Sequence, residues 1–164
     1  MIVFVDSKTV KRDGLIITNP EATFVGISDE VKGDWLTVGK HLLPPPDILG
    51  MYIESGDKDR YRMDYWRYLT DPRVRYMLLL NVYQASTELL FFVHSEYEKE
   101  LKYPKYLREF IIESLNVDSK YVITYKKFSK NKQMSNKEIN GIRLLLEDAR
   151  SKAREACDVL EGDM

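Results

Sequence analysis

The sequence predicts one domain of mixed α+β (mixed α/β) class over residues 1–164. In residues 1–56, short β-branched runs alternate with turn sequences, which is typical of strands. From residue 57 onward, apolar residues recur about every 3.6 positions, which indicates helices. A chain of this length buries enough surface for one core without disulfides. We therefore expect a strand-rich part over 1–56, followed by a part over 57–164 in which helices and strands alternate.

The strand-rich part begins with three candidate strands. They are "IVFV" at 2–5, "GLIIT" at 14–18 and "TFVGI" at 23–27, separated by the turn sequences "KRDG" and "NPEA". This pattern predicts antiparallel N-terminal strands. "WLTVG" at 35–39 is a candidate fourth strand. "PPP" at 44–46 disfavours helix and central strand, so we expect an irregular connection over 40–57 with one strand near 48–53.

The second part starts with a helix over 59–69 that "TDP" ends, because Pro72 disfavours the helical conformation in Asp71 and suits the first turn of a new helix over 72–86. "ELLFFVHS" at 88–95 is the apolar run of a central strand. A helix follows, starting at Ser95 or after Pro104, and "YVITY" at 121–125 predicts another strand. "SNKE" at 135–138 matches a capping box at a helix start.

The long C-terminal amphipathic helix carries an apolar stripe with alternating spacings of three and four. The stripe comprises Ile139, Ile142, Leu146, Ala149, Ala153, Ala156 and Leu160. We expect it to pack on the sheet or on a neighbouring helix. The alternative is a homodimer through Ala149, Ala153 and Ala156, whose small side chains would let a second backbone approach closely.

The expected order of elements is similar to that of the ribonuclease H-like fold, which has three antiparallel strands followed by helix, strand, helix, strand and helix. The similarity implies that Asp6, Glu96 and Glu147 or Asp148 converge to hold two Mg²⁺ ions about 4 Å apart. This alternative reading is a metal-dependent nuclease or nucleic-acid-binding protein. Each acid also has a structural explanation, in a turn, at a helix start or on an exposed helix face, so the first expectation is no cofactor.

The charge balance argues against a dedicated nucleic-acid binder. The chain has 25 Lys and Arg against 26 Asp and Glu, and so lacks a global basic field. A local basic run, "KYVITYKKFSKNK" at 120–132, precedes the last helix. Its residues Lys126, Lys127, Lys130 and Lys132 are the candidates for phosphate contact in the alternative reading.

The helix within "RYRMDYWRYLTDPRVRYM" concentrates arginine and aromatic residues, which are enriched at protein interface hot spots. The candidate partner-binding residues are Arg60, Tyr61, Tyr65, Trp66, Arg67 and Tyr68. The interspersed acids favour a protein partner over a polyanion. The alternative is an ordinary amphipathic helix that buries Met63, Trp66 and Leu69 and leaves the tyrosines around that contact.

The remaining features favour a non-enzymatic role, although they leave an enzyme open. There is no dinucleotide fingerprint, nucleophile elbow or metal-spaced Cys/His group, and His94 is expected to be a strand-end residue. A single cysteine, Cys157, and the lack of a signal-like start predict a cytoplasmic location, and no apolar run is long enough to span a membrane. We therefore expect a binding or regulatory accessory protein, such as one encoded by a virus or mobile element and directed at a host factor.

Overall fold

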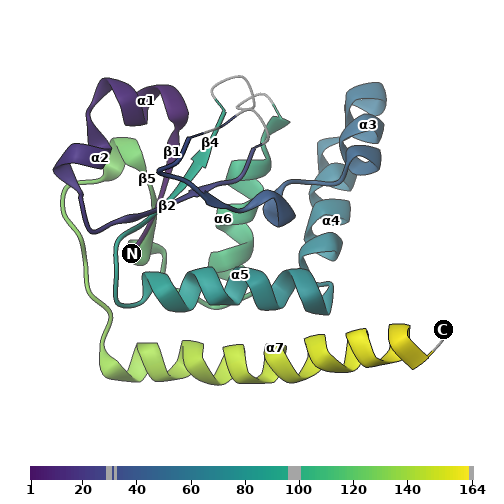
Figure 1. The fold of residues 1–164 in the computed structure, drawn as a ribbon. Coiled ribbons are helices and arrows are strands. Elements are labelled where there is room, and N and C mark those ends of the chain that lie inside the picture. Colours follow the sequence, from purple (N-terminus) through teal and green to yellow (C-terminus); the bar gives the residue numbers. More distant parts are fainter. Residues whose placement is uncertain (29–30, 32, 96–100, 163–164) are drawn as a thin grey trace.

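The computed structural model describes residues 1–28, 31, 33–95 and 101–162. Its centre is a five-stranded sheet in which every neighbouring pair of strands is parallel (Figure 1). The strands are β1 (Ile2–Asp6), β2 (Thr23–Gly26), β3 (Thr37–Val38), β4 (Leu90–His94) and β5 (Val122–Thr124), in the order β3-β2-β4-β1-β5. The predicted antiparallel N-terminal strands and the ribonuclease H-like topology are therefore wrong.

The connection between β1 and β2 explains the parallel direction. It contains two short helices, α1 (Ser7–Arg12) and α2 (Leu15–Thr18), and the second occupies the "GLIIT" segment that we predicted to be a strand. Gly14 has a φ of 61° and precedes α2, which buries Leu15 and leaves Ile17 84% exposed. A crossover with helices returns the chain to its starting end, so β2 runs parallel to β1.

A second correction concerns α3 (Pro46–Ser55), which replaces the strand predicted near 48–53. Pro46 occupies its first turn, where the fixed φ of proline suits a helix and its missing N–H costs nothing. Gly56, with a φ of 67°, ends α3, and α4 (Lys58–Leu69) follows directly. The rings of Tyr52 and Tyr61 stack at 4.4 Å between the two helices. The α3–α4 hairpin stands beside the sheet (Figure 1).

The later elements agree with the sequence predictions. They are α5 (Pro72–Ala85), α6 (Tyr103–Glu113) and α7 (Asn136–Gly162). The sequence did not predict the short 3-10 helices η1 (Lys40–Leu42), η3 (Ser119–Tyr121) and η4 (Tyr125–Lys127), of which η3 and η4 take the two ends of the strand expected over 121–125. β4 is buried at all five positions. The capping box is formed, because the amide of Glu138 donates to Ser135 Oγ and the amide of Ser135 donates to Glu138 Oε1, both at 3.2 Å.

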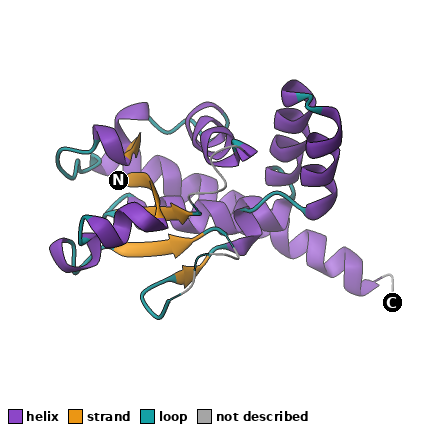
Figure 2. Cartoon of the chain, turned by 90° about the horizontal axis from the view of Figure 1, so that it is seen from above, coloured by secondary structure: helices purple, strands orange, loops and turns teal. Residues whose placement is uncertain are grey.

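Helices cover both faces of the sheet, so the fold class is α/β rather than α+β (Figure 2). Alternate residues of β1 separate the two cores: Ile2 and Phe4 pack with α4, α5, α6 and α7, whereas Val3 and Val5 pack with α1 and α2. This alternation follows from the two-residue period of a strand. The thicker helical layer therefore lies on the Ile2 and Phe4 face.

Helix α7 packs along α5, at the opposite end of the molecule from α1 (Figure 1). Ile142, Ala149 and Ala153 are buried, so the predicted stripe faces its own chain. Small side chains at these positions let the two backbones approach closely. Ala156, by contrast, is only half-buried, so the homodimer through Ala149, Ala153 and Ala156 stays a prediction.

Candidate functional site

Buried polar side chains gather where β1, β2 and β4 end. Apart from the tyrosines, the buried polar residues in the described part of the chain are Thr9, Ser28, Ser86, His94 and Ser95. All except Ser86 lie at or just after the carboxyl end of a strand. Burying polar groups is costly unless they are hydrogen-bonded. Their gathering at one edge of an apolar core makes that edge the strongest candidate site in the described part of the chain.

Asp6 ends β1 and fixes the start of α1. Its Oδ1 accepts a hydrogen bond from the amide of Thr9 at 2.8 Å, and its Oδ2 accepts one from Thr9 Oγ1 at 2.9 Å. Asp6 is also the register partner of His94 on the neighbouring strand. Register partners project on the same side of a sheet, on strands about 4.8 Å apart. Hence the carboxylate and the imidazole belong to the same edge and the same side.

His94 lies beside two serines. Its Nδ1 is 3.1 Å from the carbonyl oxygen of Ser95. Because a carbonyl oxygen only accepts hydrogen bonds, Nδ1 carries the proton in this contact. The amide of Ile27 donates to Val93 O at 2.9 Å, which extends the pairing of β2 with β4 and brings Ser28 to the same edge.

The helices that follow β1 and β4 lie on opposite faces of the sheet. The chain leaves β1 through α1 on one face of the sheet and leaves β4 through α6 on the other. In open parallel sheets, ligands bind outside the carboxyl ends of neighbouring strands whose connections diverge in this way. The carboxyl ends of β1 and β4 therefore have the position expected of a ligand site.

Next to β5, the end of α1 forms an exposed charged contact. Arg12 Nε lies 3.0 Å from Asp13 Oδ1. Hydrogen bonds from Arg12 and from Tyr125, at the end of β5, hold the pKa of Asp13 below its usual value. This contact ties the end of α1 to the residue that follows β5.

The structure does not bring the predicted metal-binding acids together. Asp6 caps α1, whereas Asp148 lies on α7 with its carboxylate 3.0 Å from Lys152 Nζ, and α1 and α7 lie at opposite ends of the molecule (Figure 1). Glu96 is outside the described residues. Within the described ranges, no group of three or more His, Cys, Asp or Glu side chains could hold a metal ion. The convergence of acids implied by the ribonuclease H-like order is lost together with that topology.

The aromatic residues of α4 mostly face inward. Tyr61 and Tyr65 are 2% and 0% exposed, and the hydroxyl of Tyr65 donates to the carbonyl of Leu42. Half-buried Tyr68 donates to His41 O at 2.6 Å, and half-buried Trp66 donates through Nε1 to Tyr106 O at 3.0 Å. These side chains join α4 to η1 and α6, so Tyr61 and Tyr65 offer no surface to a partner.

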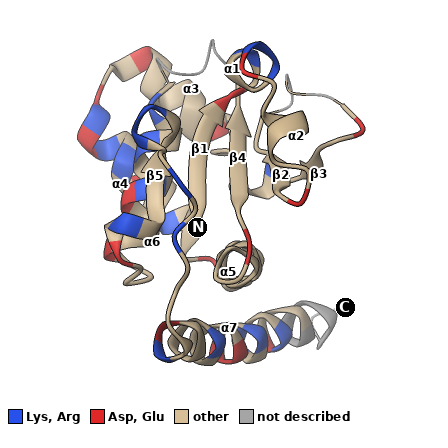
Figure 3. Ribbon diagram, turned by 90° about the vertical axis from the view of Figure 1, so that its left-hand side faces the viewer, with Lys and Arg blue, Asp and Glu red and all other residues tan. Residues whose placement is uncertain are grey.

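The outer face of α4 carries the remaining candidates. Arg60 and Arg67 are exposed, and Met63, which the sequence placed among buried residues, is 63% exposed. Spacings of three and four place these three residues on one helix face. Arg60 lies 3.7 Å from Asp64, its local counter-charge. Figure 3 shows that basic residues gather along α4.

The lysine run forms the exposed connection between β5 and α7 (Figure 3). Lys126, Lys127, Lys130 and Lys132 are all exposed. From the sequence, we expected the backbone amides at the start of α7 to bind phosphate together with this loop. The capping box already uses the amides of residues 135 and 138. The exposed lysine side chains therefore remain the main candidates for any contact with a polyanion.

Between β3 and α3, η1 carries the second histidine. His41 is half-buried, and burial lowers its pKa below the usual value. The neutral imidazole is therefore favoured in the folded protein. Two tyrosines of α4 hold the backbone of this segment in place.

In the described part of the chain, no helix has both the length and the apolar character needed to cross a membrane. Comparisons with protein-family models, with curated proteins and with solved structures each found no match to this chain.

Proposed function

We propose that this protein binds a small polar ligand at the carboxyl edge of its sheet, beside the ends of β1 and β4. The supporting observation is the gathering of buried polar side chains there: Thr9, Ser28, His94 and Ser95, with Asp6 beside them. Ligand sites combine apolar walls with a few convergent polar groups. Hydroxyl, imidazole and carboxylate groups suit a ligand that both donates and accepts hydrogen bonds.

A saturation-transfer NMR screen tests this proposal. The probes are mixtures of nucleosides, nucleotides, monosaccharides and amino acids. A ligand of the edge should lose its signal with Ser28→Ala and with His94→Ala. Ser86→Ala is the matched control, since Ser86 is equally buried but follows α5 and precedes β4, at the opposite edge. Retention of every hit in Ser28→Ala and His94→Ala, or loss with Ser86→Ala alone, contradicts the proposal.

A second candidate function is that of a non-enzymatic regulatory or accessory protein that binds a protein partner through α4. The observation that favours it is the exposure of Met63 between Arg60 and Arg67. Arginines around an exposed apolar anchor are typical of interface hot spots. The buried tyrosines would hold this face in position from behind rather than touch the partner.

The test is capture from a native lysate, compared between variants. Arg60→Ala, Met63→Ala and Arg67→Ala combined should remove a captured protein while the unfolding midpoint stays within a few degrees, because exposed substitutions typically change stability by within about 0.5 kcal/mol. Lys126→Ala and Lys130→Ala combined serve as the control on another basic surface. Equal loss with both sets indicates nonspecific charge attraction and contradicts a defined α4 interface.

A further inference from the structure

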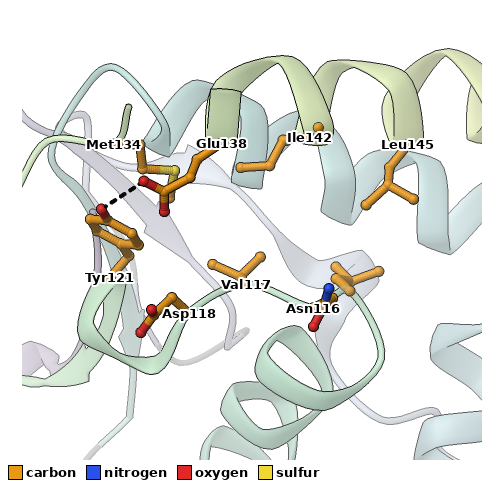
Figure 4. Close-up of a pocket in the computed structure, with 10 residues that line it drawn as sticks. Asn116, Val117, Asp118, Tyr121, Met134, Glu138, Ile142 and Leu145 are labelled. Carbon is orange, nitrogen blue, oxygen red and sulfur yellow. Dashed lines mark hydrogen bonds between the residues drawn. The ribbon is translucent and has the colours of Figure 1, made fainter. Parts of the chain in front are cut away.

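A cavity of about 270 Å³ opens between α7 and the segment that joins α6 to β5 (Figure 4). It lies under the first turns of α7, and α7 is at the far end of the molecule from α1 and the carboxyl edge (Figure 1). Its lining residues are Leu115, Asn116, Val117, Asp118, Tyr121, Met134, Glu138, Gly141, Ile142 and Leu145. This site is separate from the carboxyl edge of the sheet, and the inference drawn from it does not depend on the proposed function there.

Much of the wall is apolar. Val117 lies on one side, and Met134, Ile142 and Leu145 lie on the other (Figure 4). Leu115 and Val117 themselves are buried in the main core, which gives the floor of the cavity rigid support. Such a wall favours an aliphatic chain, because each buried CH₂ is stabilised by about 0.8 kcal/mol.

The polar part of the wall is acidic. Glu138 Oε1 accepts three hydrogen bonds, from Ser135 N at 3.2 Å, from Ser135 Oγ at 2.9 Å and from Tyr121 Oη at 3.1 Å. These bonds, from the backbone amide of Ser135 first, hold the pKa of Glu138 below its usual value, so the carboxylate is ionised at neutral pH. The other oxygen, Oε2, accepts no hydrogen bond within the described residues and lies toward the cavity (Figure 4).

The charges around the cavity do not balance. The lining contains two carboxylates, Asp118 and Glu138, and no Lys or Arg. Lys120 is the nearby cation, but it sits outside the lining, with Nζ 4.0 Å from Asp118 Oδ2 and 5.1 Å from the centre of the Tyr121 ring. Lys120 therefore offsets mainly the charge of Asp118 and acts only weakly on Glu138, for which it is the last cause of the lowered pKa. The carboxylate of Glu138 faces the cavity with one oxygen open.

We propose that this cavity binds a small aliphatic amine, with the ammonium group on Glu138 Oε2 and the carbon chain on the wall formed by Val117, Ile142 and Leu145. Asp118 at the rim adds to the negative potential that attracts the cation. An ammonium group donates up to three hydrogen bonds and accepts none, which matches an acidic wall with an open acceptor. The volume is near the lower end for ligand pockets, about 300 Å³, and so suits a chain of a few carbons.

The test is a titration of amide NMR signals with n-pentylamine. 1-Pentanol has the same chain without charge, and pentanoate has the opposite charge. We expect pentylamine to shift signals of residues 115–121 and 134–145 and to bind about tenfold or more tightly than either analogue, as charge-assisted hydrogen bonds predict. Equal binding of the three compounds, or shifts confined to other regions, would overturn the proposal.

Two variants test separately whether binding depends on the charge of the cavity and on its shape. Glu138→Gln keeps an acceptor for Tyr121 and Ser135 but removes the charge. It should weaken the binding of pentylamine about tenfold and leave the binding of 1-pentanol unchanged. Gly141→Leu should block both compounds, because a side chain added at Gly141 enters open space beside the cavity. Gly141→Ala is the matched control and should bind as the wild type does. Wild-type affinity in both Glu138→Gln and Gly141→Leu contradicts the site.

Discussion

Helices α4 and α7 are both amphipathic, yet they attach to the protein by different means. Helix α4 buries large tyrosines, and its hydroxyl and indole groups donate to backbone carbonyls of η1 and α6. Helix α7 instead lays small residues, Ala149 and Ala153, against α5. One helix is positioned by specific long side chains and the other by close approach of two backbones. The two should therefore respond in opposite ways to changes of side-chain size.

The largest effect is expected from removal of a buried ring in α4. Tyr65→Ala should lower the free energy of unfolding by about 3–5 kcal/mol, the cost typical of deleting a large buried aromatic side chain. It also leaves the carbonyl of Leu42 without its donor. Chemical denaturation measures the change. Arg67→Ala, on the exposed face of the same helix, is the control and should stay within about 0.5 kcal/mol. A small effect of Tyr65→Ala would mean that the tyrosine does not position α4.

In α7 the substitution expected to destabilise the fold is one that enlarges a buried side chain. Ala149→Leu should cost about 1–3 kcal/mol, because Ala149 is 1% exposed and the added atoms must push α7 away from α5. Ser151→Leu, exposed on the same helix, should change stability little. Thermal unfolding of the two variants gives the comparison. If Ala149→Leu were tolerated as well as Ser151→Leu, close backbone packing would not be what holds α7.

A smaller effect tests how α7 begins. Ser135→Ala removes the oxygen that accepts from the amide of Glu138, and should cost about 0.5–2 kcal/mol, as loss of a helix N-cap does. Ser129→Ala, an exposed serine in the preceding loop, is the control. Chemical denaturation at matched conditions distinguishes them. Identical midpoints for the two variants would show that the capping box adds nothing to the stability of α7.

The smallest expected effect is a pH dependence at η1, the segment that α4 holds. The folded-state pKa of His41 is lowered by burial, so the folded protein binds fewer protons than the unfolded chain below about pH 6.5. Stability contributed by the neutral ring is full above about pH 6.5 and falls as the pH drops through that value toward the folded-state pKa. The difference in melting temperature between wild type and His41→Gln, followed from neutral to mildly acidic pH, isolates this histidine. A constant difference would show that His41 does not titrate differently on folding.

Local signals in the sequence were enough to predict those elements whose physical cause lies within a few residues. Pro72 after Asp71 marks the start of α5, and the Ser135–Glu138 box marks the start of α7, because caps satisfy amides only a few residues away. β4 was recognisable because a strand buried on both faces carries an unbroken apolar run. The α2 segment was misread, because a β-branched run of five residues fits either a strand or one helical turn.

The candidate site was only partly accessible from the sequence. Asp6 was identified as a residue at a strand end, and His94 was read as a strand-end residue without a function. Ser28 and Ser95 carried no signal, because nothing local shows that β2, β1 and β4 end at the same edge. On α4, the alternative reading of an amphipathic helix placed Met63 and Leu69 on the buried face. Leu69 is buried, but Met63 is 63% exposed and Tyr65 is fully buried instead.

Periodicity, capping and proline placement in the sequence were enough to establish most of the helices, the central strand and the amphipathic character of α7, since each depends on neighbours within a few positions. The tertiary structure alone decided that the strands are parallel, that the tyrosines of α4 face inward and that polar residues far apart in the chain meet at one edge. The physical reason is that strand direction depends on how each connection crosses the sheet, and burial depends on which distant element covers each face.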